Sequence, residues 1–75
     1  MTYRLDLPTI MLAFKDDHQT AVTIQADEIV DVIGPAEDSR FVVVNVNSEQ
    51  FRVFASDLDN HGKQIRRAAK AVSTS

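Results

Sequence analysis

The alternation of hydrophobic and polar residues is clearest between Arg40 and Ala55, where it predicts a β-hairpin. The segment RFVVVNVNSEQFRVFA is rich in valine and phenylalanine, which favour strands. Asn47-Ser48 divides it into two arms, and asparagine tolerates the left-handed backbone of a tight turn. The first arm is apolar on both faces, which is typical of a strand in the middle of a sheet or against a partner. We therefore expect this hairpin to be the centre of the fold.

The chain before the hairpin also favours extended structure. Residues 3–7 alternate between apolar and polar and are followed by Pro8, so we expect a short extended arm or an edge strand there. Residues 9–15 form a continuous apolar run, which favours a strand. The polar segment KDDHQT, residues 15–20, is the first predicted turn.

The next segment fits two patterns. Its β-branched residues favour a strand over 20–25, a turn at Ala26-Asp27 and a strand over 28–33. A helix over 25–33 remains the alternative, because four apolar residues also follow a helical stripe. These are Val22, Ala26, Ile29 and Ile33.

The end of the chain predicts a helix over residues 57–72. Ser56 is a good N-cap, and the aspartates that follow suit the positive end of a helix dipole. Gly62 weakens the middle of this helix by about 1 kcal/mol relative to alanine, so the first turn would be separate from the rest. Residues 73–75 are expected to form a disordered tail.

Together these elements predict a mainly β fold: a small SH3- or Sm-like bent antiparallel sheet or partial barrel of about five strands, with a C-terminal helix. With 75 residues the chain is too short for two cores, so we expect residues 1–72 to form one domain. A domain of this size is marginally stable, and the chain has no cysteine for a disulfide. We therefore expect it to self-associate as a homodimer or a higher oligomer.

Charge divides the chain into an acidic body and a basic end. Residues 1–60 carry eleven acidic and four basic residues, a net charge of −7, whereas residues 61–75 carry four basic residues and no acidic one. No window approaches the roughly 18 to 20 apolar residues of a membrane helix, and the first residues lack the order of a signal peptide. We expect a cytoplasmic protein with no membrane partner.

The basic residues of the end are the first candidate for binding. On a helical wheel they lie opposite the apolar residues, where they could contact nucleic-acid phosphates, a protein partner or the acidic body of the protein itself. They are Lys63, Arg66, Arg67 and Lys70.

The apolar surface of the hairpin is the second candidate. Val42, Val44 and Phe54 are expected to form a strip that a monomer would rarely expose. Either the terminal helix covers this strip, or a protein partner or second copy binds it.

Residues that could carry catalysis or hold an ion are few. Asp57, Asp59 and Gly62 imitate the start of an EF-hand loop, but an alanine occupies the place of its last carboxylate. His18 lies beside two aspartates in the first turn, yet no nucleophile accompanies it. We therefore expect no enzyme activity, cofactor or metal; a small hydrolase that uses His18 or His61 is a further alternative.

Two motifs carry a resemblance to known families. ADEIVDV, residues 26–32, looks like a strand that begins with an acidic residue and isoleucine, and FRVFASDL, residues 51–58, leads through Ser-x-Leu into a helix. In this order, over residues 21–65, they resemble the output domain of LytTR-type response regulators and the small flagellar FlbD-type proteins. The resemblance implies a regulator of transcription that binds DNA through loops and strand ends. A similarity of architecture alone, to acidic Sm-like proteins of the Rof type, implies inhibition of a partner at its RNA-binding surface.

Our leading hypothesis is a noncatalytic protein-interaction or regulatory module that associates with itself or with a protein partner. The alternative is a nucleic-acid-associated regulator that acts through the basic helix.

Overall fold

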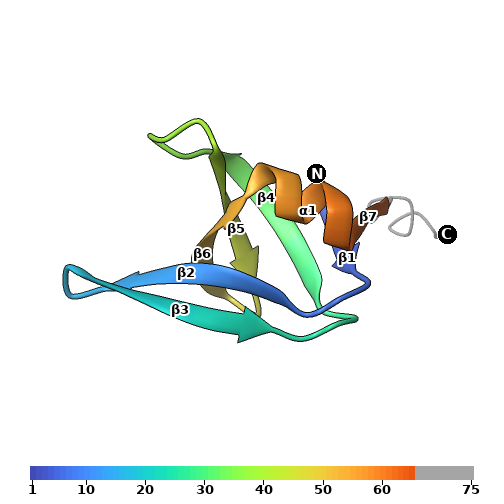
Figure 1. The fold of residues 1–75 in the computed structure, drawn as a ribbon, viewed down its shortest axis with the longest axis horizontal. Coiled ribbons are helices and arrows are strands. Elements are labelled where there is room, and N and C mark those ends of the chain that lie inside the picture. The colour runs from blue at the N-terminus through green and yellow to red at the C-terminus, as the bar shows by residue number, and fades with distance from the viewer. Residues whose placement is uncertain (66–75) are drawn as a thin grey trace, which may run out of the picture.

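The computed structural model describes residues 1–65, which form seven antiparallel strands in one open sheet and one short helix (Figure 1). The elements are β1 (Thr2–Leu5), β2 (Thr9–Lys15), β3 (His18–Ile24), β4 (Ile29–Pro35), β5 (Phe41–Val46), β6 (Glu49–Phe54), α1 (Ala55–His61) and β7 (Gly62–Ile65). Their order across the sheet is β3-β2-β6-β5-β4-β1-β7. The predicted mainly β fold is confirmed, with seven strands rather than about five.

The predicted central hairpin is confirmed. β5 and β6 pair along their whole length, with Val44 opposite Phe51. Asn47 and Ser48 form the turn between them, and both have a positive φ, 52° and 69°. A two-residue turn with this backbone follows the natural twist of the two strands. β6 continues the sheet to β2, and β5 continues it to β4, so the hairpin lies in the middle.

β2 and β3 form a second hairpin, which projects from the body of the molecule (Figure 1). The predicted strand over 9–15 is confirmed, but the turn after it is shorter than KDDHQT. Asp16 and Asp17 alone form this turn, with φ of 51° and 65°. β3 therefore begins at His18, which lies in register with Lys15 of β2, directly across the turn.

The segment that fitted both a helix and a strand is a strand, so the alternative of a helix over 25–33 is wrong. β4 pairs with β1 on one side and with β5 on the other, and these backbone hydrogen bonds outweigh a local helical pattern. The register shifts between Val32 and Gly34, and Ile33 is exposed at this bulge. β1 lies between β4 and β7, so it is not an edge strand.

The predicted helix over 57–72 is too long. α1 begins at Ala55, Ser56 is not its N-cap, and the helix ends at His61. The next four residues form β7, in which Gly62 lies opposite Leu5 of β1. Gly62 favours this ending because its helix propensity is low. Its lack of a side chain also matters, because a Cβ there would lie 3.1 Å from the carbonyl oxygen of Leu58. The rest of the predicted helix lies outside the described residues.

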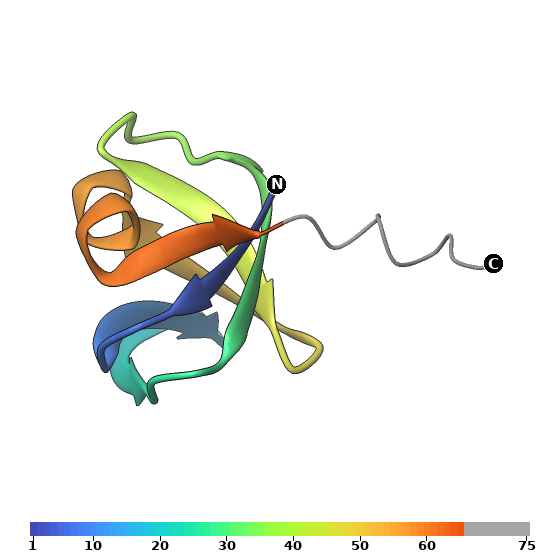
Figure 2. The same cartoon turned by 90° about the vertical axis from the view of Figure 1, so that its right-hand side faces the viewer.

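The core lies on the inner face of the curled sheet, which Figure 2 shows from one end. It is formed by Leu5, Met11, Ile24, Val30, Val44, Val46, Phe51, Val53 and Leu58. α1 contacts β2 and β6 on one side and β1 and β7 on the other, and it contributes Leu58 to the core. The helix therefore fills the space between two strand pairs, β2–β6 and β1–β7, that do not pair with each other. Within residues 1–65 no helix is long and apolar enough to cross a membrane.

Candidate interaction surface

The outer face of the sheet, opposite the core, carries a group of apolar side chains from β2, β5 and β6. Cross-strand pairs place them side by side: Leu12 is opposite Arg52, and Phe41 is opposite Phe54. The exposed fraction is 61% for Ile10, 46% for Phe14 and 43% for Phe54, and the other members are half-buried. We call this surface the outer apolar patch; it consists of Ile10, Leu12, Phe14, Phe41, Val43 and Phe54 around Arg52.

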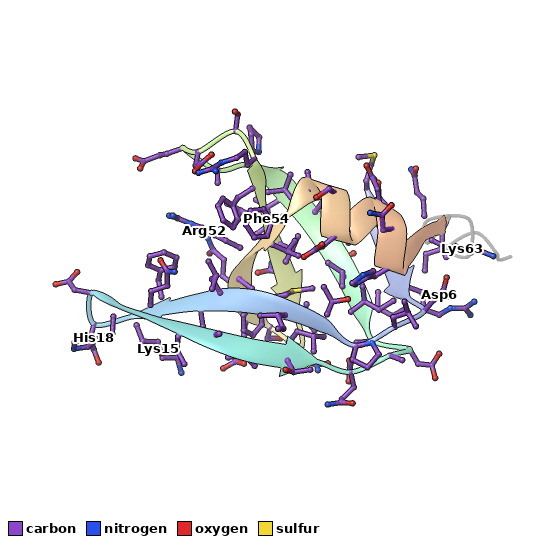
Figure 3. All side chains as sticks on the ribbon, in the orientation of Figure 1. Asp6, Lys15, His18, Arg52, Phe54 and Lys63 are labelled. Carbon is purple, nitrogen blue, oxygen red and sulfur yellow. The ribbon has the colours of Figure 1, made fainter. Side chains whose placement is uncertain are left out.

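Ring contacts order the patch. The guanidinium carbon of Arg52 lies 4.3 Å from the centre of the Phe14 ring, a cation–π contact. Phe41 and Phe54 are stacked, with ring centres 4.3 Å apart and planes 28° apart. Figure 3 shows Arg52 and Phe54 pointing into the space beside the projecting β2–β3 hairpin. A surface with its rings already held in place loses little side-chain entropy when a partner binds.

A shallow hollow of about 210 Å³ lies within the patch. Its walls are almost entirely apolar, and Asp57 of α1 stands at its rim. It is lined by Ile10, Leu12, Phe41, Arg52, Val53, Phe54 and Asp57. Its size and lining suit one apolar side chain of a partner, with Arg52 and Asp57 available to polar groups around that side chain.

A second hollow, of about 430 Å³, lies where the β2–β3 hairpin leaves the body of the protein. Part of its lining is apolar and consists of Ala13, Val22 and Phe51. Lys15 and Glu49 also line this hollow, and they form an exposed ion pair with 3.8 Å between Nζ and Oε2. An ion pair as exposed as this contributes little to stability.

The predicted strip of Val42, Val44 and Phe54 is not one surface. Val44 has no exposed surface, and Val42 packs against the core, whereas Phe54 points to the outer face. The cause is the period of two along a strand: residues 42 and 44 point to the opposite side from 41, and Phe41 is the partner of Phe54. Of the three residues, Phe54 alone belongs to the outer apolar patch.

Sequence reasoning missed the contribution of β2 to this patch. In the run TIMLAFK, Thr9 and Met11 are buried, whereas Ile10 and Phe14 are exposed. Successive side chains of a strand point to opposite faces, so the sequence could show that Ile10 and Phe14 share one face and Thr9 and Met11 the other. It could not show which face is buried, because apolar residues lie on both.

The basic candidates are divided between described and undescribed parts of the chain. Lys63 is exposed on β7, directly opposite the exposed Arg4 of β1. Figure 3 shows Lys63 at the other end of the molecule from the tip of the β2–β3 hairpin. Arg66, Arg67 and Lys70 lie outside the described residues. Arg4 was not among the predicted residues, because only the pairing of β1 with β7 brings it beside Lys63.

The two histidines lie far apart in the fold. His18 is exposed at the tip of the β2–β3 hairpin. His61 ends α1, and its Nδ1 lies 3.1 Å from the hydroxyl oxygen of Thr9, which is 1% exposed. The same hydroxyl lies 3.0 Å from the carbonyl oxygen of Leu7; when it donates its one proton there, the Nδ1–H of His61 is the donor to Thr9. The pair joins the helix to the start of β2, and residues 1–65 hold no group of three metal-binding side chains.

Asp38 and Arg40 form an ion pair in the loop before β5, shorter than the pair of Lys15 and Glu49. Arg40 donates to both carboxylate oxygens, at 3.1 Å from Nε and 2.7 Å from Nη2, and its backbone N–H donates at 3.0 Å. The side-chain hydrogen bonds, followed by the backbone one, lower the pKa of Asp38 from 3.8 to about 2. These hydrogen bonds therefore restrain the loop that leads into β5.

Comparison with protein-family models, with curated proteins and with solved structures found no match for this chain. The resemblance to LytTR-type and FlbD-type proteins stays a prediction.

Proposed function

We propose that this chain is a noncatalytic protein-interaction module that binds a protein partner through the outer apolar patch. The observation that carries the proposal is the exposure of Ile10, Phe14 and Phe54 on one face of two paired strands, β2 and β6. Small monomeric proteins rarely expose a contiguous apolar surface, and those that do commonly use it to bind.

The composition of the patch supports the same function. Aromatic residues and arginine are enriched at the centres of protein interfaces, where they contribute much of the binding free energy. Three phenylalanines and Arg52 are grouped here, with a hollow that fits one apolar side chain. The net charge of −7 over residues 1–60 favours a partner with basic residues around its apolar anchor.

The bent sheet also supports a binding role. We propose that it belongs to the SH3 or Sm kind of architecture, in which a small curved sheet presents one face to a partner. We also propose that the protein acts in the cytoplasm. Figure 2 shows the curvature of the sheet, and the strand order leaves it open.

Site-specific photo-cross-linking tests the proposal in cells of the source organism. A photoreactive amino acid at Ile10 is expected to give a protein adduct of defined mass, and the additional change Phe54→Ser to reduce its yield. The matched control is the same photoreactive residue at Gln64, which is exposed on β7. No adduct from Ile10, or the same adducts from both positions, would contradict the proposal.

A second candidate function, nucleic-acid association, rests on the register of β1 with β7. Arg4 lies opposite Lys63, so the fold places beside Lys63 a second cation that was not among the four predicted from the sequence. Binding to a nucleic-acid pool would be tight at low salt and weaken steeply as salt rises. Reversing the charges of the four predicted cations should abolish it, whereas Lys15→Glu should not. No change in fluorescence anisotropy at low salt with any DNA or RNA pool would exclude this candidate.

A further inference from the structure

The two edges of the open sheet are protected very differently. β7 is four residues long and carries Lys63, and short, lysine-bearing strands resist pairing with another chain. β3 is seven residues long, HQTAVTI, and contains neither proline nor lysine. Of the elements described, β2 alone pairs with it. The β3 edge therefore has the features of a strand that accepts a partner strand.

The absence of charged residues along β3 also favours pairing with another strand. Residues 18–26, HQTAVTIQA, contain no aspartate, glutamate, lysine or arginine, although the body of the protein is strongly acidic. From His18 to Thr23 every residue of β3 except Val22 is exposed. An exposed, uncharged strand of this length lacks the charges by which most proteins prevent edge-to-edge pairing.

The geometry of the β2–β3 turn shows which backbone groups are open. In a hairpin with a two-residue turn, the residues next to the turn, here Lys15 and His18, form a hydrogen-bonded pair. Hydrogen-bonded pairs then alternate along the strands. The N–H and C=O groups of Gln19, Ala21 and Thr23 consequently point away from β2 to the open edge.

We propose that β3 pairs antiparallel with β3 of a second copy, about a two-fold axis at Ala21. This register places Gln19 of one copy opposite Thr23 of the other and forms about six backbone hydrogen bonds. The residues between them place Thr20 opposite Val22. No cross-strand pair joins two like charges, so the strand is complementary to itself.

A second copy suits this edge better than an unrelated peptide because the pairing also joins the outer apolar patches. The side chains of Ala21 and Thr23 lie beside Leu12 and Ile10 on the outer face. The residue at the axis, Ala21 of each copy, is small, so the outer apolar patches of both copies would lie on one continuous face of the joined sheet. The proposal rests on the edge and not on the function of the patch, so either can fail alone.

The test is the mass of the protein in solution, measured by light scattering and sedimentation from about 1 µM to 1 mM, the range in which small interfaces dissociate. The unchanged chain is expected to reach twice its monomer mass. Ala21→Lys should weaken dimerisation about tenfold or more, because two ammonium groups would meet at the axis. Gln64→Lys adds the same charge at the other edge and should leave the dimer intact.

A monomer throughout this range, or a dimer that both variants affect equally, would overturn the proposal. If Ala21→Lys does not fold, hydrogen exchange of the unchanged chain decides. The amides of Ala21 and Thr23 are expected to exchange more slowly as concentration rises, while the amide of Ser48, in the exposed turn of the β5–β6 hairpin, keeps its rate. A dimer whose β3 edge amides exchange freely would place the interface elsewhere.

Discussion

Positive φ angles at residues other than glycine set the turns of this protein. Asp16, Asp17, Asn47 and Ser48 all adopt this backbone, which costs an ordinary L-residue about 1–2 kcal/mol. Asparagine and aspartate tolerate it best. Asn47 therefore indicated the turn in the sequence, although serine at its second position tolerates a positive φ less well than asparagine or glycine.

Replacing Ser48 by glycine is expected to stabilise the protein by about 0.5–1 kcal/mol, because glycine adopts a positive φ without strain. Urea unfolding followed by circular dichroism measures the change. The control is Ser39→Gly, in a loop where no positive φ is required, which should be neutral or slightly destabilising. Equal effects at both positions would show that the turn backbone is not the cause.

The ion pair of Asp38 and Arg40, in the loop between β4 and β5, should make a small part of the stability depend on pH. The pKa of Asp38 is lowered in the folded protein to about 2, so its small stabilising contribution is complete above about 4 and is lost as pH falls through 2. Arg40→Gln removes the largest cause and should raise this pKa toward 3.8, as an NMR titration of the carboxyl carbon would show. Arg52→Gln, on the outer face, should leave the titration unchanged.

At the scale of the elements, the last helix shows how pairing overrides a local pattern. The residues after Gly62 have an amphipathic helical spacing, yet the structure uses the first of them to extend the sheet beside β1. α1 has a single buried residue, Leu58, and the Thr9–His61 contact joins its last turn to β2. Backbone hydrogen bonds hold its two ends, from the N–H of Asp6 to the carbonyl of His61 at 2.6 Å and from the N–H of Ala55 to the carbonyl of Arg40 at 2.9 Å. Of the side chains of α1, Leu58 alone anchors it in the core.

Leu58→Ala is expected to cost about 2–5 kcal/mol, since it removes a 3% exposed leucine from the core and leaves a cavity. Asp59→Ala is the matched control; it is the next residue of the same helix, is exposed, and should change stability by less than about 0.5 kcal/mol. Denaturant unfolding compares the two. A small effect of Leu58→Ala would mean that α1 is not anchored by this residue.

For the whole molecule, the proposed dimer links stability to concentration. A partner that binds only the folded chain raises the unfolding free energy by about 2.7 kcal/mol at 100 times its Kd. For a domain of this size that corresponds to a rise in Tm of roughly 10–20 °C. Calorimetry of the unchanged chain over a hundredfold range of concentration should show a rising Tm.

The same measurement on Ala21→Lys should give a Tm that depends less on concentration, because β3 can no longer pair about the axis. A Tm that does not change with the concentration of the unchanged chain would count against a dimer coupled to folding. The outer apolar patch would then be exposed on a monomer, which is the situation that the cross-linking experiment addresses separately.

The local pattern of the chain was sufficient for the mainly β class, the strand over 9–15 and the central hairpin with its turn. Alternation and turn chemistry are properties of neighbouring residues, so they can be read without the rest of the fold. The amino-acid sequence also places all eleven acidic residues before residue 60 and leaves residues 18–26 uncharged.

The tertiary structure alone decided which side of each two-sided strand is buried. Val44 and Phe54 are both apolar, as are Met11 and Ile10, yet one of each pair lies in the core and the other outside. That choice depends on partners distant in sequence, such as β2 beside β6 and β7 beside β1. For the same reason the outer apolar patch, and not the valine strip, is the surface that we propose for binding, and β3 forms a long, uncharged edge of the sheet.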